Sequence, residues 1–196
     1  MSILNTFVLA EVFSDEPDDL LPFGQLLNDR VLVVALNELG ADQEAKNALV
    51  ALFLNMYYEY MLELPKWPYR GANPQLRRLN SFLLVDEATN IMRYQFPVLM
   101  DLMLQGREFG VGVILSSQYL SHFKEGDTNY GQPLLTWFIH KVPSVALKDL
   151  VSLGLNRATA EQAAEISRLP VHHALYSSLG FPGRFMRGLP FYELEA

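Results

Sequence analysis

Two apolar runs, each followed at once by polar residues, organise the centre of this chain. Phe82–Val85 is short and continuously apolar, as expected of a parallel strand that is covered on both faces. The adjacent carboxylates Asp86 and Glu87 follow it. A helical stretch then leads to a second predicted strand, Val111–Ser116, whose polar end continues to Gln118. Because ligands of open α/β sheets bind at the carboxyl ends of the strands, these polar residues are expected to form a site.

The chain before these runs contains a predicted strand and a long predicted helix. Val31–Leu36 is continuously apolar and rich in β-branched residues, which favours a buried strand. Asp42 is a good N-cap for the helix that follows, which is expected to run to about Leu62. Apolar residues recur along that helix with helical spacing and predict one stripe, formed by Ala45, Leu49, Leu52, Phe53, Met56 and Tyr60.

Helix and strand signals also follow the acidic pair. Pro97 suits the first turn of a helix. The apolar stripe of that helix is predicted to comprise Phe96, Leu99, Met100, Met103 and Leu104. The elements predicted farther on are a short helix running into a strand over Leu134–Ile139, Lys141 and Val142, a helix over Ser144–Leu153, a helix opened by the capping box of Thr159 and Gln162, and a terminal hairpin formed by Val171–Ser177 and Arg184–Arg187.

The polar ends of the two central strands carry side chains that suit phosphate chemistry. Mg²⁺ keeps several waters and binds one or two carboxylates, a role that Asp86 fits. Glu87 suits the orientation or deprotonation of an attacking water, and Gln118 suits the detection of a γ-phosphate. An acidic pair after an apolar run also occurs at ordinary strand-to-helix turns, where it caps the helix, and this alternative stays open. The second predicted strand also ends in polar residues, Ser116-Ser117-Gln118, and this favours the catalytic interpretation of the acidic pair.

These stretches resemble the sequence signatures of one superfamily of ATPases. Leu83–Ala88 is similar to a Walker B motif. Gln105–Gln118 resembles the arginine, aromatic, glycine, strand and Ser/Thr-Gln signature of the HerA/FtsK superfamily of hexameric DNA-pumping ATPases. Arg30–Leu39 and the long helix after it resemble the strand and helix that precede Walker B in those proteins. The resemblance covers most of Asn28–Phe191 and is strongest over Ser81–Gln118.

The resemblance implies a fold and a set of site residues. The fold is an α/β, RecA-like P-loop NTPase half-domain, with a mainly parallel sheet flanked by helices and an antiparallel C-terminal hairpin. Asp86 would hold the metal, Glu87 and Gln118 would be catalytic, and Arg107 would belong to the nucleotide or subunit-interface network. Arg107 has a second interpretation, as a cation that balances the C-terminal end of its own helix. The family often has an arginine near the position of Lys141, and a lysine there is less suited to bidentate phosphate binding.

The resemblance also implies a function. The chain would be the C-terminal portion of an ATPase that uses ATP and Mg²⁺ to translocate or remodel DNA as a homo-oligomer, a hexamer in the full-length protein. Such motors serve DNA-end processing, conjugation, chromosome segregation and anti-phage restriction, including phosphorothioation-dependent systems. DNA, contacted through the assembled oligomer, and partner proteins of a DNA-processing or defence system are therefore the expected partners.

The sequence lacks the residues that would complete such an ATP site. No glycine in the 196 residues is followed by Lys-Ser or Lys-Thr, as a phosphate-binding P-loop requires. In the resembling family this loop lies upstream of Walker B in the same polypeptide. We therefore expect a C-terminal half of a larger ATPase, with residues 1–28 as an acidic lead-in or linker and residues 29–196 as the ATPase part. The isolated chain is expected not to hydrolyse ATP. The alternative is a non-catalytic protein-interaction module on a degenerate ATPase scaffold.

The loop over Pro65–Asn80 is the best local candidate for DNA contact. Basic and aromatic residues are interleaved there, a pattern that suits the nucleic-acid backbone. The four basic residues are Lys66, Arg70, Arg77 and Arg78, which lie beside Trp67 and Tyr69. A solvated loop held by salt bridges is the ordinary alternative.

The composition of the chain narrows the classes of protein to which it can belong. Half of the residues are hydrophobic, which excludes a disordered chain, and the formal net charge of -7 argues against a free-standing nucleic-acid binder. No apolar run reaches about 18 residues and no signal peptide is evident, so no membrane segment is expected. The absence of cysteine excludes thiol chemistry and fits a cytoplasmic location. The four histidines lack metal-ligand spacing and are interpreted as structural: His122, His140, His172 and His173.

Overall fold

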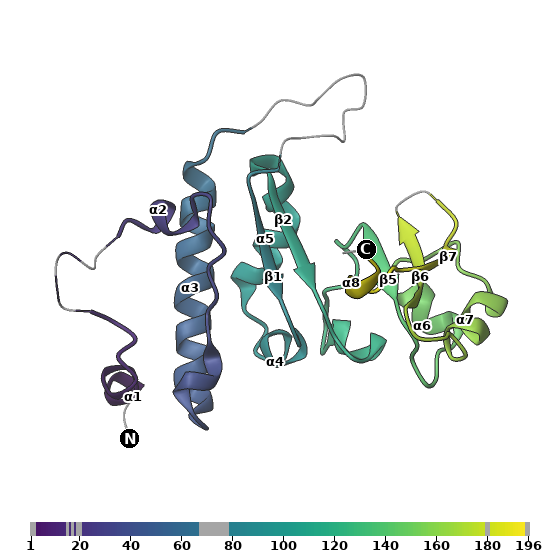
Figure 1. Ribbon diagram of the computed structural model, residues 1–196, viewed down its shortest axis with the longest axis horizontal. Helices are drawn as coiled ribbons and strands as arrows, with labels where there is room; N and C mark the ends of the chain where they lie inside the picture. The colour runs from purple at the N-terminus through teal and green to yellow at the C-terminus, as the bar shows by residue number, and fades with distance from the viewer. Residues whose placement is uncertain are drawn as a thin grey trace. The chain divides into compact units, whose positions relative to one another are not determined.

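The computed structural model describes residues 3–14, 16, 18, 21–66, 79–178 and 181–194. The fold is mixed α/β, with a two-stranded parallel sheet, a two-stranded antiparallel hairpin and a three-stranded antiparallel sheet (Figure 1). The chain divides into two compact units. The first comprises Met1–Val85 and Tyr94–Leu115, and the second comprises Asp86–Arg93 and Ser116–Ala196.

The first unit contains one long helix, several short ones and the parallel sheet. Its helices are α1 (Ile3–Leu9), α2 (Phe23–Leu27), α3 (Gln43–Glu63) and α5 (Pro97–Gln105), its 3₁₀ helices are η2 (Leu36–Leu39) and η3 (Gly106–Phe109), and its strands are β1 (Ser81–Val85) and β2 (Val111–Leu115). The predicted Asp42 cap is confirmed, because its carboxylate accepts the Ala45 backbone N–H at 3.0 Å. The expected first-turn position of Pro97 is also confirmed.

Both α1 and α2 pack against α3 (Figure 1). Phe7 of α1 is buried with Leu39 and Ala45. The Phe23 ring of α2 lies edge-on to the ring of Phe53, with 5.5 Å between the two centroids. Two helices of the acidic N-terminal region are therefore part of the first unit's packing.

The predicted stripe of α3 is confirmed at Ala45 and wrong at Leu52 and Met56, and its other three members are half-buried. The buried residues of the helix are Ala45, Val50, Leu54, Tyr57 and Met61, whereas Leu52 and Met56 are each 41% exposed. Apolar residues occur around most of the circumference of α3, so their spacing fits more than one face. The buried face carries the Tyr57 hydroxyl, which makes a 2.7 Å hydrogen bond with Ser81 Oγ at the start of β1. In α5 the same kind of correction applies, since Val98, Leu99 and Leu102 are buried and Leu104 is 61% exposed.

β1 and β2 pair in parallel, with Ser81 opposite Val111 and Val85 opposite Leu115. Both strands are therefore confirmed. Side chains alternate between a covered face, which includes Leu83, and an open face, which includes Phe82 at 58% exposure and Leu84 at 65%. The Phe82 ring lies over Gly112, where a Cβ would be only 2.6 Å from two ring carbons. Glycine at this position lets the ring lie close to the neighbouring strand.

The strand predicted over Val31–Leu36 is wrong. Residues 31–35 have no regular secondary structure, and Leu36 begins η2. Val31 is 92% exposed and Val33 76%. β-branched residues favour a strand only where the segment can pair with a neighbouring strand and pack one face against other residues. No strand in the described part of the chain pairs with this segment.

The second unit follows the carboxyl ends of β1 and β2. Its helices are α4 (Thr89–Met92), α6 (Leu147–Ser152), α7 (Ala160–Ile166) and α8 (Phe191–Leu194), with the 3₁₀ helix η4 (Leu120–Phe123), and its strands are β3 (Lys124–Glu125), β4 (Thr128–Asn129), β5 (Thr136–Ile139), β6 (His173–Ser178) and β7 (Arg184–Arg187). The strand order of the larger sheet is β5-β6-β7, all antiparallel. The terminal hairpin is thereby confirmed.

Other local predictions for the second unit have mixed outcomes. The capping box of α7 is confirmed, because Thr159 and Gln162 exchange two side-chain-to-backbone hydrogen bonds of 3.1 Å. The short helix expected at Leu134 is wrong, since Leu134 and Leu135 have no regular secondary structure and β5 begins at Thr136. Among the described residues, no helix combines the length and apolar character needed to cross a bilayer.

Candidate functional site

The candidate site comprises the residues that follow the two parallel strands. Asp86 and Glu87 follow β1, and Ser116, Ser117 and Gln118 follow β2. Because Val85 and Leu115 are paired, the two strands end level with one another. All five residues belong to the second unit, and hydrogen bonds join the two polar ends. The expectation that these ends lie together is therefore confirmed.

Asp86 is held by its neighbours through one carboxylate oxygen. Its Oδ1 accepts the backbone N–H of Glu87 at 3.0 Å and also accepts the hydroxyl of Ser116. The carbonyl of Ser116 accepts the Ala88 N–H at 2.8 Å, which ties the chain after β1 to the chain after β2. Within the part of the chain that the structure describes, Oδ2 of Asp86 has no hydrogen-bond partner. One oxygen thus orients the exposed carboxylate and the other is left for a ligand.

Glu87 adopts a left-handed backbone conformation, with a φ of 48°. This region disfavours residues with a Cβ and typically stores strain at functional sites. The side chain is exposed, and its Oε1 accepts the Gln118 Nε2–H at 3.0 Å. The conformation turns the chain from β1 into α4, whose first backbone hydrogen bonds include one from the Asn90 N–H to the Glu87 carbonyl. Glu87 and Gln118, which were both predicted as catalytic, are therefore in direct contact.

A second polar cluster involves three half-buried side chains. Thr89 Oγ1, Ser117 Oγ and His122 Nδ1 form a triangle with sides of 2.7, 2.8 and 2.8 Å. Each of the three contacts needs one hydrogen, and the two hydroxyls supply two. A hydrogen on Nδ1 would therefore complete a closed cycle of three hydrogen bonds, whereas an Nδ1 without a hydrogen would accept one from a hydroxyl. The triangle links α4, the end of β2 and η4. The interpretation of His122 as a structural residue omitted this link, because no spacing pattern in the sequence relates it to Thr89.

Tyr130 supports the end of α4. Its hydroxyl donates to the Met92 carbonyl at 3.4 Å, and both residues are almost fully buried. Burial raises the pKa of the Tyr130 phenol, and the nearby charge of Glu125 acts in the same direction. The helix after the acidic pair is thus held at its first turn by Thr89 and at its last turn by Tyr130.

The described residues contain no group of three or more histidine, cysteine or acidic side chains that could enclose a metal ion. Magnesium does not need such a group, because it keeps several waters and usually takes one or two carboxylates together with substrate phosphates. The exposed Asp86, with one oriented oxygen and one unpartnered oxygen, fits this kind of ligand set. The residues present therefore fit Mg²⁺ held partly by water and phosphate.

Arg107 lies in η3, in the first unit, and is exposed. Its backbone carbonyl accepts the Gly110 N–H at 3.4 Å, and its guanidinium makes no hydrogen bond or ion pair with the described residues. Arg107 and the acidic pair belong to different units. Lys141 is exposed between β5 and α6.

The candidate DNA-contacting residues fall mostly outside the described part of the chain. Arg70, Arg77 and Arg78 lie outside the described residues. Lys66 is described, and its Nζ forms a 2.8 Å ion pair with Glu108 and lies 5.1 Å from the centroid of the Phe109 ring. The ammonium is thus already engaged within the first unit.

No protein-family model matches this chain, and no curated protein matches it in sequence. The evidence for function is therefore the site itself: two paired parallel strands that end in an acidic pair and a Ser-Ser-Gln sequence.

Proposed function

We propose that this chain carries the metal- and water-handling half of a HerA/FtsK-like ATPase that couples ATP hydrolysis to DNA translocation or remodelling. The observation that carries the proposal is the contact between the two strand ends, where Gln118 donates to Glu87 and Ser116 donates to Asp86. A sheet that presents a carboxylate pair beside an amide is what P-loop ATPases use to position metal, water and γ-phosphate. The wider fold would then be RecA-like, and the protein cytoplasmic.

Each residue of the site has a distinct proposed role. Asp86 binds Mg²⁺ directly or through water, with the oxygen that its neighbours leave unpartnered. When bound, the metal supplies charge neutralisation at the phosphates. Glu87 accepts a hydrogen bond or proton from the attacking water, and Gln118 couples the position of Glu87 to the phosphate. The phosphate cradle is not in this sequence, so another segment of the parent protein or another subunit provides it.

The test compares substitutions in the native protein that carries this chain. Glu87→Gln should leave nucleotide binding nearly unchanged and reduce phosphate release at least about 100-fold. Asp86→Ala should weaken magnesium-dependent nucleotide binding. Asp127→Asn, which changes an exposed carboxylate in the β3–β4 turn of the same unit, is the matched control and should leave both quantities unchanged. Hydrolysis at the parental rate by Glu87→Gln would refute the assignment. Hydrolysis by the chain alone that depends on Glu87 would also refute the assignment, since such hydrolysis would require a different phosphate cradle.

Assembly of the ATPase as a ring, hexameric in the full-length protein, gives Arg107 a proposed role. A basic residue of one subunit can stabilise phosphate charge held by the next. Rings mixed from Arg107→Ala and Glu87→Gln subunits would then contain some junctions with both groups intact and regain activity. If rings shown to be mixed recover nothing, Arg107 does not act across a subunit interface.

A protein-interaction module is the second candidate, and the open face of the parallel sheet favours it. Parallel sheets are normally covered on both faces, but Phe82, Leu84 and Ile114 are 58, 65 and 47% exposed. This candidate predicts that the parent protein works with Glu87→Gln and fails with Phe82→Ser. The ATPase proposal predicts failure with Glu87→Gln.

A further inference from the structure

One face of the β5-β6-β7 sheet carries two aromatic rings and an arginine in a single row. Phe138 of β5 is paired with Tyr176 of β6, and Tyr176 is paired with Arg184 of β7. Directly paired residues of an antiparallel sheet project to the same face. The Phe138 and Tyr176 rings are in contact, with centroids 5.2 Å apart and planes inclined by 45°.

This row is open to solvent, whereas the opposite face is packed. Phe138 is 58% exposed and Tyr176 36%, and Arg184 is also exposed. On the opposite face, Trp137 and Leu175 are buried, and the Trp137 ring lies edge-on to Phe123 at a centroid distance of 5.1 Å. Helix α7 packs against β6 (Figure 1). The sheet thus has a structural face and a free face, and the aromatic row lies on the free face.

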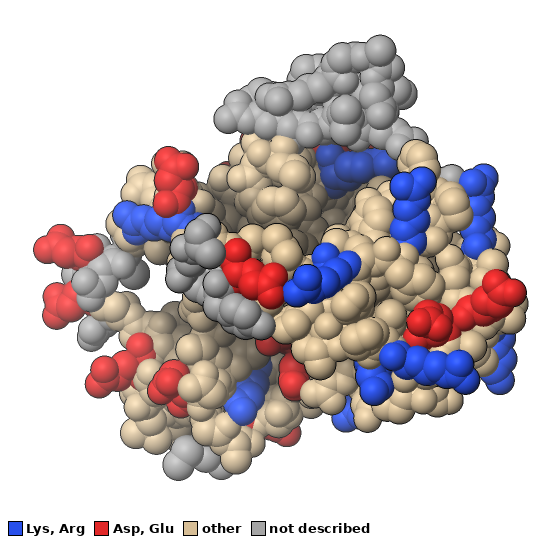
Figure 2. All heavy atoms as spheres, turned by 45° about the vertical axis from the view of Figure 1, so that its right-hand side comes forward, with Lys and Arg blue, Asp and Glu red and all other residues tan. Residues whose placement is uncertain are grey.

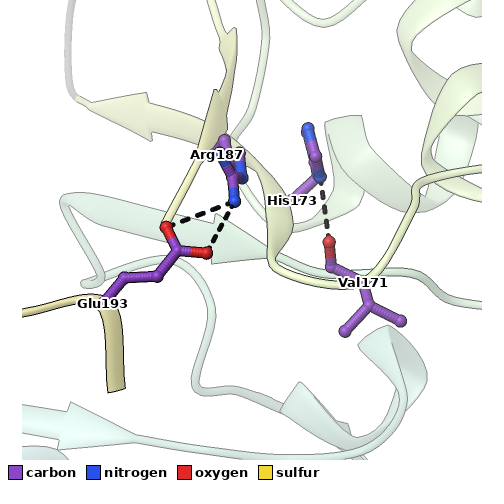
Figure 3. A network of polar contacts seen from close by, with 4 residues as sticks. All are labelled: Val171, His173, Arg187 and Glu193. Carbon is purple, nitrogen blue, oxygen red and sulfur yellow. Dashed lines mark hydrogen bonds and ion pairs between the residues drawn. The ribbon is translucent and has the colours of Figure 1, made fainter. Parts of the chain in front are cut away.

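The one charged side chain that the three strands place on the face of the row is basic. Arg184 lies on that face, whereas His173 and Arg187, which are paired with each other, project to the opposite face, and the strands contain no acidic residue. Arg187 is held by an ion pair with Glu193, at 3.0 and 3.3 Å to its two carboxylate oxygens (Figure 3). Arg184 has no ion pair or side-chain hydrogen bond with the residues that the structure describes. Its charge is therefore free to meet an anion beside the two rings.

The two units also differ in overall charge. The first contains 13 acidic and 7 basic residues, whereas the second contains 9 acidic and 8 basic residues. In Figure 2 the basic side chains are most frequent on the right-hand part of the face in view. The net negative charge of the chain thus resides mainly in the first unit and does not argue against an anionic ligand on the sheet of the second.

We propose that this sheet face binds single-stranded nucleic acid, with bases stacked on Phe138 and Tyr176 and a phosphate bound by Arg184. Exposed aromatic rings on a β-sheet accept unpaired bases irrespective of sequence, and a neighbouring cation holds the backbone. Bases within a duplex are stacked on one another and cannot reach such rings. The ligand class is therefore a single strand, and the surface is separate from the acidic pair.

The binding test uses the chain as it is. Fluorescence anisotropy measures the dissociation constants of labelled oligo(dT), oligo(U) and a duplex of equal length at low salt. We expect single strands to bind and to exceed the duplex in affinity. The comparison of oligo(dT) with oligo(U) assigns the ligand to DNA or RNA. Tighter binding of the duplex, or no saturable binding of any single strand, would overturn the proposal.

Substitutions locate the binding to the row. Phe138→Ala and Tyr176→Ala should each weaken binding by about 5- to 150-fold, the effect of losing one stacked base. Tyr176→Phe keeps the ring and should bind like the wild type. Arg184→Ala should lower the salt dependence of binding by about 0.7 in the slope of log affinity against log salt, as expected for one phosphate contact.

The opposite face supplies the control. Phe185→Ala removes an aromatic ring that is 42% exposed and belongs to the same strand as Arg184, but it projects to the other face. We expect no change in affinity. An equal loss in Phe185→Ala and Phe138→Ala would refute the assigned face, provided that circular dichroism shows both variants folded. A Phe138→Trp variant gives a second readout, since the added fluorescence should be quenched by a stacked base, and an unquenched signal with saturating oligonucleotide would also refute stacking at this position.

This inference does not require the proposed ATPase function. The binding assay contains no nucleotide, and none of the substituted residues belongs to the acidic site. If the aromatic row does not bind single strands, the proposed roles of Asp86 and Glu87 are unaffected. If those roles are refuted, the proposed binding by the aromatic row is unaffected.

Discussion

The left-handed backbone of Glu87 predicts the sign of a glycine substitution. A φ of 48° costs a residue with a Cβ about 1–2 kcal/mol, and glycine avoids this cost. Glycine also increases the conformational entropy of the unfolded chain, which costs about 0.4–1 kcal/mol relative to alanine. Both variants lose the same hydrogen bond from Gln118. The strain that glycine avoids exceeds its entropy cost, so Glu87→Gly should be more stable than Glu87→Ala by roughly 0.8 kcal/mol.

A matched position within a helix should show the opposite sign. Glu59 is exposed in the interior of α3, where glycine is less stable than alanine by about 0.5–1 kcal/mol. Urea unfolding, followed by circular dichroism, gives the free energy of unfolding of all four variants. A Trp67→Phe background leaves the buried Trp137 as the only tryptophan, so its fluorescence reports the second unit separately. If Glu87→Ala is as stable as Glu87→Gly, the strained conformation and the inference of a functional turn are both wrong.

The remaining predictions concern caps, burial and the histidine triangle. The Ala45 N–H lowers the pKa of Asp42 below 3.8, so the stabilisation by this carboxylate is complete above that value and is lost as the pH falls through the lowered pKa. The stability difference between wild type and Asp42→Ala in urea should therefore shrink in acid, and a constant difference would exclude a role for the charge. Burial raises the pKa of Tyr57 above 10.0, so stability should fall as the pH rises from about 10 through the raised pKa. Tyr57→Phe should resist alkaline unfolding, measured by circular dichroism, and an unchanged alkaline midpoint would contradict the burial. His122→Ala should cost about 1–2 kcal/mol because the hydroxyls of Thr89 and Ser117 each lose one of their two contacts in the triangle. His122→Asn should recover part of this loss in thermal or urea unfolding, and equal losses would show that the hydrogen bonds of His122 contribute nothing.

The parts of the fold that the sequence predicted correctly depend on local signals. The caps at Asp42 and Thr159 act within one helical turn, and Pro97 restricts its own backbone, so neighbouring residues are enough to recognise them. The meeting of Asp86 with Ser116 was also predictable, because parallel pairing brings equivalent strand ends together.

The errors arise where distant residues decide the outcome. The apolar sequence of α3 allows several buried faces, and its partners in space select the one that includes Tyr57. Val31 and its neighbours have strand-forming side chains but no strand to pair with among the described residues. The triangle at His122 requires three segments to meet, and the φ of Glu87 is imposed by the turn between β1 and α4. None of these follows from residue type or spacing.

The level ends of β1 and β2 restrict how such a site can change during evolution. From the paired start at Ser81 and Val111, each strand runs five residues before its polar end. A single inserted or deleted residue in either strand would shift one end along the ladder and move its side chains to the opposite face. Asp86 would then no longer meet Ser116, even if every residue type were retained. Side chains in these strands can be exchanged for others of similar size, but the lengths of the two strands must change together or not at all.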